Sequence, residues 1–233
     1  MAVQHGMYAA IVPAAGVGKR MQANCPKQYL KINDKTVLEH TVEKLLSHPR
    51  IDQVIVALNK DDPYFDHLII ANNEKVVRIE GGKERVDSVL AGIKQVDMKR
   101  HPWVLVHDAA RPCVTHQDIS ALIDSCIGAD IGGILASPVK DTMKRTNAAQ
   151  MIEKTECREQ LWHALTPQFY PTKLLKMAIE HGLENQHNIT DESSAIEQFG
   201  QQSQIVEGRG DNIKITHPDD LAYATFILSQ QTI

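Results

Sequence analysis

The chain has 233 residues, 42% of them hydrophobic and 23% charged, which suits a globular α/β domain with a sizeable core. A formal net charge of −4 excludes the diffuse basic surface that nonspecific nucleic-acid binding requires, so we expect no nucleic-acid partner. The apolar run near the N-terminus is broken by Pro13 and Gly16, short of the roughly 20 residues that cross a membrane. Four cysteines without a C-x-x-C pair are typical of reduced thiols, and we therefore expect a cytoplasmic protein without a membrane partner.

Short β-rich runs alternate with helical patterns in the first part of the chain. Strands are predicted over residues 8–12, 53–58, 75–79, 103–107 and 131–136. Helices are predicted over 37–47 and 63–71, and apolar stripes at helical spacing predict two more, from Val86 to Val96 and from Ile119 to Ile127. This alternation predicts an α/β fold with a doubly wound, mostly parallel sheet and helices on both faces. Ligands bind such sheets at the carboxyl ends of the strands.

The alternation stops between residues 138 and 171. Polar and apolar residues alternate there around a turn-like Thr146-Asn147, so we interpret 138–171 as a hairpin-like β-arm that projects from the sheet. Helices are then predicted over 172–181 and 191–199, strands over 204–207 and 212–215, and a last helix capped by Thr216 and Asp219. No repeat or linker interrupts the pattern, so we expect residues 1–233 to form a single domain that includes the arm.

A loop of small residues, "PAAGVG", follows the first predicted strand and leads into "KRMQANCPKQYL". Its small side chains let an anion approach backbone N–H groups, and the cations after it supply charge. This chemistry suits a polyphosphate, although an ordinary strand-to-helix connection has similar residues. The loop lacks the third glycine of G-x-G-x-x-G, and Pro13 and Arg20 stand where a P-loop needs glycine and Ser or Thr.

Two later motifs also follow predicted strands. In "GGKERVDSV", Gly82 permits close backbone approach, and backbone groups with the Ser88 hydroxyl could bind the edge of a cytosine. Ser88 suits a hydrogen bond within its own helix equally well. In "HDAARP", Asp108 suits a ribose hydroxyl or Mg²⁺ and Arg111 a phosphate, with a mutual ion pair as the alternative.

The pattern P-A-A-G-x-G-x-R-M with P-K-Q-Y-L resembles the signature of nucleotidyltransferases that make activated sugars and alcohols. With "PVKDT", "LWHALTPQ", "TDESSAIE" and "VEGRGDNIKITHPDDL", the chain resembles one family over essentially its whole length: the 2-C-methyl-D-erythritol 4-phosphate cytidylyltransferases. The resemblance implies a Rossmann-like nucleotidyltransferase fold. It also implies transfer of a cytidylyl group from CTP to methylerythritol phosphate in non-mevalonate isoprenoid synthesis, with release of pyrophosphate and a need for Mg²⁺.

The resemblance also assigns residues to the two substrates. Arg20 and Lys27 match the pair that stabilises charge, and Arg158 and Lys214 match the residues that position the acceptor phosphate. Residues implied to contact CTP are Ala14, Ala15, Gly16, Gly18, Gly82, Ser88, Asp108 and Ala109. Residues implied on the acceptor side are Arg111, Thr142, Arg158, Thr190 and Lys214. Lys83 departs from the acidic residue of a related enzyme, which leaves base recognition to the backbone.

Several alternatives remain open at this point. Mg²⁺ is expected to bind with the triphosphate, and Asp108 is the candidate protein ligand. The acceptor could be another polyol phosphate, such as ribitol 5-phosphate, or the chain could be a non-catalytic nucleotide-binding regulator, although the presence of both Arg20 and Lys27 argues against the latter. We expect a homodimer in which the arm carries Arg158 into the partner's site. The alternative is an arm that folds back onto its own domain.

Overall fold

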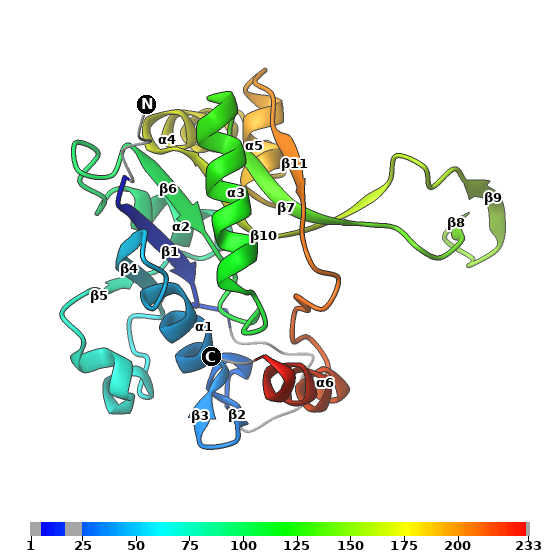
Figure 1. The fold of residues 1–233 in the computed structure, drawn as a ribbon. Coiled ribbons are helices and arrows are strands. Elements are labelled where there is room, and N and C mark those ends of the chain that lie inside the picture. The colour runs from blue at the N-terminus through cyan, green and yellow to red at the C-terminus, as the bar shows by residue number, and fades with distance from the viewer. Residues whose placement is uncertain (1–5, 17–24, 232–233) are drawn as a thin grey trace.

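A seven-stranded sheet forms the centre of the computed structural model, which describes residues 6–16 and 25–231 (Figure 1). In spatial order its strands are β11 (Gln204–Glu207), β7 (Gly133–Pro138), β10 (Trp162–Pro171), β6 (Trp103–Val106), β1 (Tyr8–Pro13), β4 (Ile51–Leu58) and β5 (Val76–Glu80). Neighbouring strands are parallel except where β10 pairs with β6 and β7. The predicted mostly parallel sheet is therefore confirmed.

Helices cover both faces of this sheet. They are α1 (Val37–Leu46), α2 (Arg85–Ile93), α3 (His116–Ala129), α4 (Thr172–Glu184) and α5 (Glu192–Gln198), whereas α6 (Pro218–Gln230) packs in a separate core. Alternate residues of β1 point to opposite cores: Val12 packs with residues of α1 and α3, and Ile11 packs with residues of α2, α4 and α5. Among the described helices none is both long and apolar enough to cross a membrane.

A third, smaller core joins α6 to a hairpin of two short strands, β2 (Lys31–Ile32) and β3 (Lys35–Thr36). Its buried side chains include Ile32, Ile215 and Ile227, all nearly inaccessible to solvent. This core fixes two segments beside the sheet edge. One carries the short 3₁₀ helix η2 (Lys27–Tyr29) and the other carries Lys214.

Three local predictions were wrong. Residues 63–71 form no α-helix but two 3₁₀ turns, η3 (Phe65–His67) and η4 (Ile69–Asn72), because Leu68 between them is extended. Residues 212–215 form no strand, since Ile215 N–H donates to the Ala110 carbonyl of a loop rather than to a strand ladder. The last helix is capped one residue later than predicted: Asp220 accepts the N–H groups of Thr216 and His217.

The arm is shorter than predicted. Strands β8 (Met143–Thr146) and β9 (Ile152–Glu156) form a separate hairpin far from the main sheet (Figure 1). The Asn147 side chain holds its turn by accepting the N–H groups of Ala149 and Met151. The rest of the predicted arm, β10, returns into the sheet, because its stretch from Leu165 to Tyr170 is buried between β6 and β7.

Candidate active site

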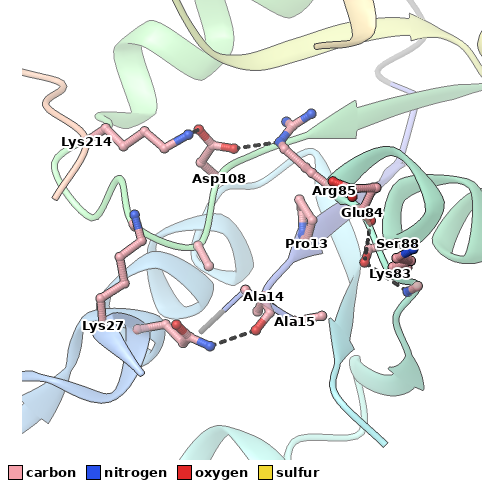
Figure 2. A pocket seen from close by; sticks show the side chains of 15 residues that line it. Pro13, Ala14, Ala15, Lys27, Lys83, Glu84, Arg85, Ser88, Asp108 and Lys214 are labelled. Carbon is pink, nitrogen blue, oxygen red and sulfur yellow. Dashed lines mark hydrogen bonds and ion pairs between the residues drawn. The ribbon is translucent and has the colours of Figure 1, made fainter. Parts of the chain in front are cut away.

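A cavity of about 290 Å³ opens at the carboxyl ends of β1, β5 and β6 (Figure 2). Its lining comes from the loop after each of these strands, from η2, from the first turn of α2 and from the segment before α6. The lining residues are Pro13, Ala14, Ala15, Gly16, Lys27, Gln28, Gly82, Lys83, Glu84, Arg85, Ser88, Asp108, Ala109, Ala110 and Lys214. Most of the residues predicted to bind CTP therefore meet at one edge of the sheet, where an α/β fold places its ligands.

The loop after β1 is fixed by one backbone hydrogen bond and one from a side chain. Ala14 N–H donates to the Ala57 carbonyl at 2.8 Å, and the amide of buried Gln28 donates to the Ala14 carbonyl at 2.7 Å. Ala14, Ala15 and Gly16 then line the cavity with small groups. Gly18 and Arg20 lie outside the described residues, so their predicted roles stay predictions.

The loop after β5 needs both of its glycines. A Cβ atom at Gly82 would lie 2.1 Å from the Asp87 Cβ, and one at Gly81 would lie 2.8 Å from the Ser88 Oγ. Ser88 is 2% exposed, and its hydroxyl accepts Gly82 N–H at 3.0 Å and donates to the Glu84 carbonyl at 3.3 Å. The local hydrogen bond considered as an alternative is thus present, and it shapes the loop that lines the cavity.

Asp108 is the centre of a charged cluster at the end of β6. Its Oδ1 accepts from Arg85 Nε at 3.0 Å, and its Oδ2 lies 2.8 Å from Lys214 Nζ. Burial by itself would raise the pKa of Asp108, but Arg85, Lys214 and Arg111 together hold that pKa well below its ordinary value. The carboxylate at the cavity is therefore ionised throughout the physiological pH range.

Buried polar groups fix the backbone of Asp108. Its N–H donates to Thr166 Oγ1 at 3.0 Å, and that hydroxyl lies 2.9 Å from His107 Nδ1. Since His107 Nε2 faces the Arg111 carbonyl at 3.0 Å, Nε2 carries the proton and Nδ1 accepts from Thr166. Burial lowers the pKa of His107 to about 4, so the ring is neutral near pH 7.

Two lysines from distant parts of the sequence face the same cavity. Lys27 Nζ donates to the Ile215 carbonyl at 2.8 Å, which places it beside the segment that carries Lys214. In Figure 2 both side chains extend along the same side of the cavity, with the Asp108 carboxylate at Lys214. This convergence of two cations, predicted from motifs far apart, suits a ligand with several phosphates.

Four predicted acceptor residues do not line the cavity. Arg111 is 8% exposed and donates to the Asn212 carbonyl at 2.6 Å, with its Nε 3.6 Å from Asp108 Oδ2, so the alternative of an ion pair is found in a buried form. Thr190 is exposed just before α5. Thr142 and Arg158 are exposed in the arm, where Arg158 donates to the Lys140 carbonyl.

Sequence reasoning missed Arg85 and Glu192. Arg85 lines the cavity and donates to Glu192 through both terminal nitrogens, at 2.7 and 3.1 Å. Burial lowers the pKa of Arg85, but Glu192 and Asp108 raise it overall. In the sequence, Arg85 stands inside the glycine motif and Glu192 inside "TDESSAIE". Only the fold shows that the two side chains pair.

Comparisons with known proteins agree along almost the whole chain. The family model for 2-C-methyl-D-erythritol 4-phosphate cytidylyltransferase matches residues 8–230. A protein with that name from Colwellia psychrerythraea is 60% identical over 96% of both chains, and one from Vibrio vulnificus is 55% identical over 95% of this chain and 94% of its own.

Solved structures of proteins with the same name are also similar. The one from Francisella tularensis has a TM-score of 0.81 and 35% identity, covering 95% of this chain and all of its own (100%). The one from Thermus thermophilus has a TM-score of 0.80 and 26% identity, covering 96% of this chain and 99% of its own. With the matches in sequence, these findings show that the chain belongs to the 2-C-methyl-D-erythritol 4-phosphate cytidylyltransferase family.

Proposed function

We propose that the cavity binds CTP and that the chain is a nucleotidyltransferase acting on 2-C-methyl-D-erythritol 4-phosphate. The products are 4-diphosphocytidyl-2-C-methyl-D-erythritol and pyrophosphate, a step of non-mevalonate isoprenoid synthesis. Besides family membership, one observation carries the proposal: Lys27 and Lys214 converge on a cavity whose opposite wall is a glycine loop. The two lysines match a triphosphate, and the small residues Gly82 and Ser88 on the opposite side match a flat base.

The reaction joins two anions and needs no general base. A phosphate monoester has a second pKa of about 6, so the acceptor is largely dianionic at neutral pH. One of its oxygens bonds to the α-phosphorus of CTP, and the bond from that phosphorus to the oxygen bridging to the β-phosphate breaks in line with it. Lys27 stabilises the charge that gathers during transfer, and we assign the same role to Arg20.

The site suits Mg²⁺ that is held mainly by the nucleotide. Among the described residues there is no group of three metal-binding side chains. Two carboxylates line the cavity, those of Glu84 and Asp108, and Asp108 is the one between Lys214 and Arg85. Mg²⁺ commonly binds one or two carboxylates together with substrate phosphates, so a single carboxylate fits. When bound, the ion would neutralise the triphosphate, and Asp108 is our candidate protein ligand.

We assign the acceptor side to two subunits. Lys214 lies in the cavity, whereas Arg158 and Thr142 belong to an arm that leaves the body of its own chain (Figure 1). A homodimer in which each arm reaches the partner's cavity would bring these groups together with Lys214 and Thr190. Within this proposal, Arg158 and Lys214 align the acceptor phosphate. We retain a cytoplasmic location as part of the same proposal.

A pyrophosphate-release assay tests the function. CTP, UTP, ATP and GTP are each supplied with methylerythritol phosphate, and CTP is supplied separately with ribitol 5-phosphate. We expect the highest turnover with CTP and methylerythritol phosphate, because uracil would set a carbonyl against backbone acceptors that fit the cytosine amine. Equal turnover of CTP and UTP would contradict the base-recognition model. Preference for ribitol 5-phosphate would identify a different acceptor, and absence of turnover would favour a regulator.

A further inference from the structure

Glu192 is a buried carboxylate that does not line the cavity. It is the first residue of α5, is 2% exposed, and accepts both terminal nitrogens of Arg85. Arg85 is the first residue of α2 and uses its remaining nitrogen, Nε, to bind Asp108. One guanidinium therefore connects the beginnings of two helices to the end of β6, and Figure 2 shows its bond to Asp108.

The planar guanidinium makes this connection directional. Because Glu192 occupies the two terminal nitrogens, the plane of the Arg85 fork is set, and its Nε points to Asp108 Oδ1. The second oxygen of Asp108 is then turned toward Lys214, 2.8 Å away. A change at Glu192 would propagate through Arg85 and Asp108 to the Lys214 ammonium.

Glu192 is itself held firmly. Asp191 caps α5 by accepting Ser194 N–H at 2.9 Å, and Gln168 of β10 donates to the other Asp191 oxygen at 2.9 Å. Ser193 N–H donates to the Gln168 side chain at 2.9 Å, which anchors the same turn a second time. The carboxylate that orients Arg85 is thus fixed to the central sheet.

We infer that Glu192 is a positioning residue of the transfer reaction: through Arg85 it orients the Asp108 carboxylate and thereby places Lys214 for the acceptor phosphate. This inference rests on the proposed function, because that function gives Lys214 its ligand. It also links the nucleotide loop before α2 to the segment before α5 that carries Thr190. A buried pair that served stability alone would have no effect on Lys214.

The test compares wild type with E192Q, R85Q and the double variant R85Q/E192Q. Each is measured for kcat, for KM with both substrates, and for Tm. We expect E192Q to lower kcat/KM for the acceptor on the order of 10- to 100-fold, since small misplacements at a reacting centre have effects of this size. E192Q should also lower Tm, because Arg85 loses a charged partner in a buried place.

The double variant separates positioning from stability. Removing both buried charges should return Tm toward that of wild type, while kcat/KM stays low, and adding E192Q to R85Q should cost no further activity. D52N is the matched control. Asp52 lies at the amino end of β4, the end away from the cavity. Its side chain is 8% exposed, and its Oδ1 lies 2.8 Å from His101 Nε2. D52N should lower Tm and leave kcat/KM within about twofold of wild type.

Three results would overturn the inference. They are recovery of kcat/KM together with Tm in the double variant, an E192Q enzyme within about twofold of wild type, and a further loss when E192Q is added to R85Q. If E192Q does not fold, the double variant and R85Q still decide between the outcomes. A wild-type enzyme that is inactive with CTP and methylerythritol phosphate would instead contradict the proposed function, and the Tm series would be unaffected.

Discussion

The cavity and the arm differ in how their charged and apolar side chains are covered. At the cavity Asp108 is buried, Glu192 is buried behind it, and Arg85 binds both of them. In the arm, Met151 and Ile152 are 66% and 64% exposed. A buried network of charges is costly to rearrange, so the geometry around the cavity is set within one chain. Exposed apolar residues on a projecting hairpin suit the partner contact that we propose for the homodimer.

This difference bears on how the two substrates are bound. The groups that we assign to CTP lie in one chain at the end of the sheet, whereas Arg158 of the acceptor side lies in the arm. We expect the nucleotide side to be preorganised and the acceptor side to depend on assembly. Variants in the two regions should therefore fail in different ways.

The largest effect is expected at the cavity. Lys27→Ala should lower kcat on the order of 100- to 1,000-fold and weaken CTP binding much less, because the charge that Lys27 opposes grows during transfer. Equilibrium CTP binding and single-turnover rates measure the two separately. Lys31→Ala, an exposed lysine in the adjacent hairpin, is the control and should behave as wild type. Weakened binding with unchanged single-turnover chemistry would make Lys27 an affinity residue only.

Variants of the arm should impair the acceptor side of the site, which in our proposal is completed only when the dimer assembles. Arg158→Ala should lower kcat/KM for the acceptor roughly 100-fold, since it removes a cation that aligns the attacking phosphate. When this variant is mixed with Lys27→Ala under conditions of subunit exchange, about half of the dimers are mixed and half of their sites are intact. Activity should then recover to roughly a quarter of wild type.

The same mixing experiment can contradict the shared site. If each arm serves its own chain, every site keeps one lesion, and mixing gives the average of the two variants. Subunit exchange must be confirmed independently, for example with two differently labelled wild-type chains. Activity at the average of the variants, with exchange confirmed, would place Arg158 in its own chain's site.

Most helices and strands could be predicted from the sequence, because the spacing of apolar residues along the chain depends only on neighbouring positions. The stripe from Val86 to Val96 predicted α2, and the apolar run 103–107 predicted β6. The wrong predictions arose where distant contacts decide. Residues 212–215 look like a strand, but the Ala110 carbonyl and Arg111 hold them as a loop. The end of the predicted arm looks exposed by its alternation, but β10 fits between β6 and β7.

The site was predictable to the extent that its residues lie in motifs. Ala14 and Asp108 stand within two residues of the ends of predicted strands, and Gly82 lies in the loop after a third, so their meeting at one edge follows from the parallel sheet. The pairing of Arg85 with Glu192 depends on the approach of α2 and α5, which no spacing in the sequence encodes. The role of Arg158 in a partner's site remains a prediction.

A smaller effect is expected when the apolar surface of the arm is made polar. Met151→Ser combined with Ile152→Ser should raise the dissociation constant of the dimer on the order of 10- to 100-fold, because each copy loses apolar contacts. Analytical ultracentrifugation over a dilution series measures this. Ile69→Ser is the control, since Ile69 is 74% exposed but lies on the body in η4. Equal dissociation constants for the arm variant and wild type would contradict a dimer through the arm.

The smallest effect is expected from acid, and it should act on histidines of the body whose pKa burial lowers, His48 and His107, rather than on the arm. Burial lowers the pKa of His107 to about 4 from an ordinary value of 6.5. The folded state keeps this ring neutral down to about pH 4, whereas the unfolded chain takes up a proton below pH 6.5, so stability falls as pH falls between these values. At pH 5 this amounts to about 2 kcal/mol of unfolding free energy.

His107→Gln should therefore lose less stability than wild type between pH 7 and pH 5 in denaturant titrations, even if it is less stable at pH 7. His163→Gln, at an exposed position of β10, should keep the wild-type dependence. The same pH dependence in His107→Gln and in wild type would show that His107 is not one of the groups on which acid acts.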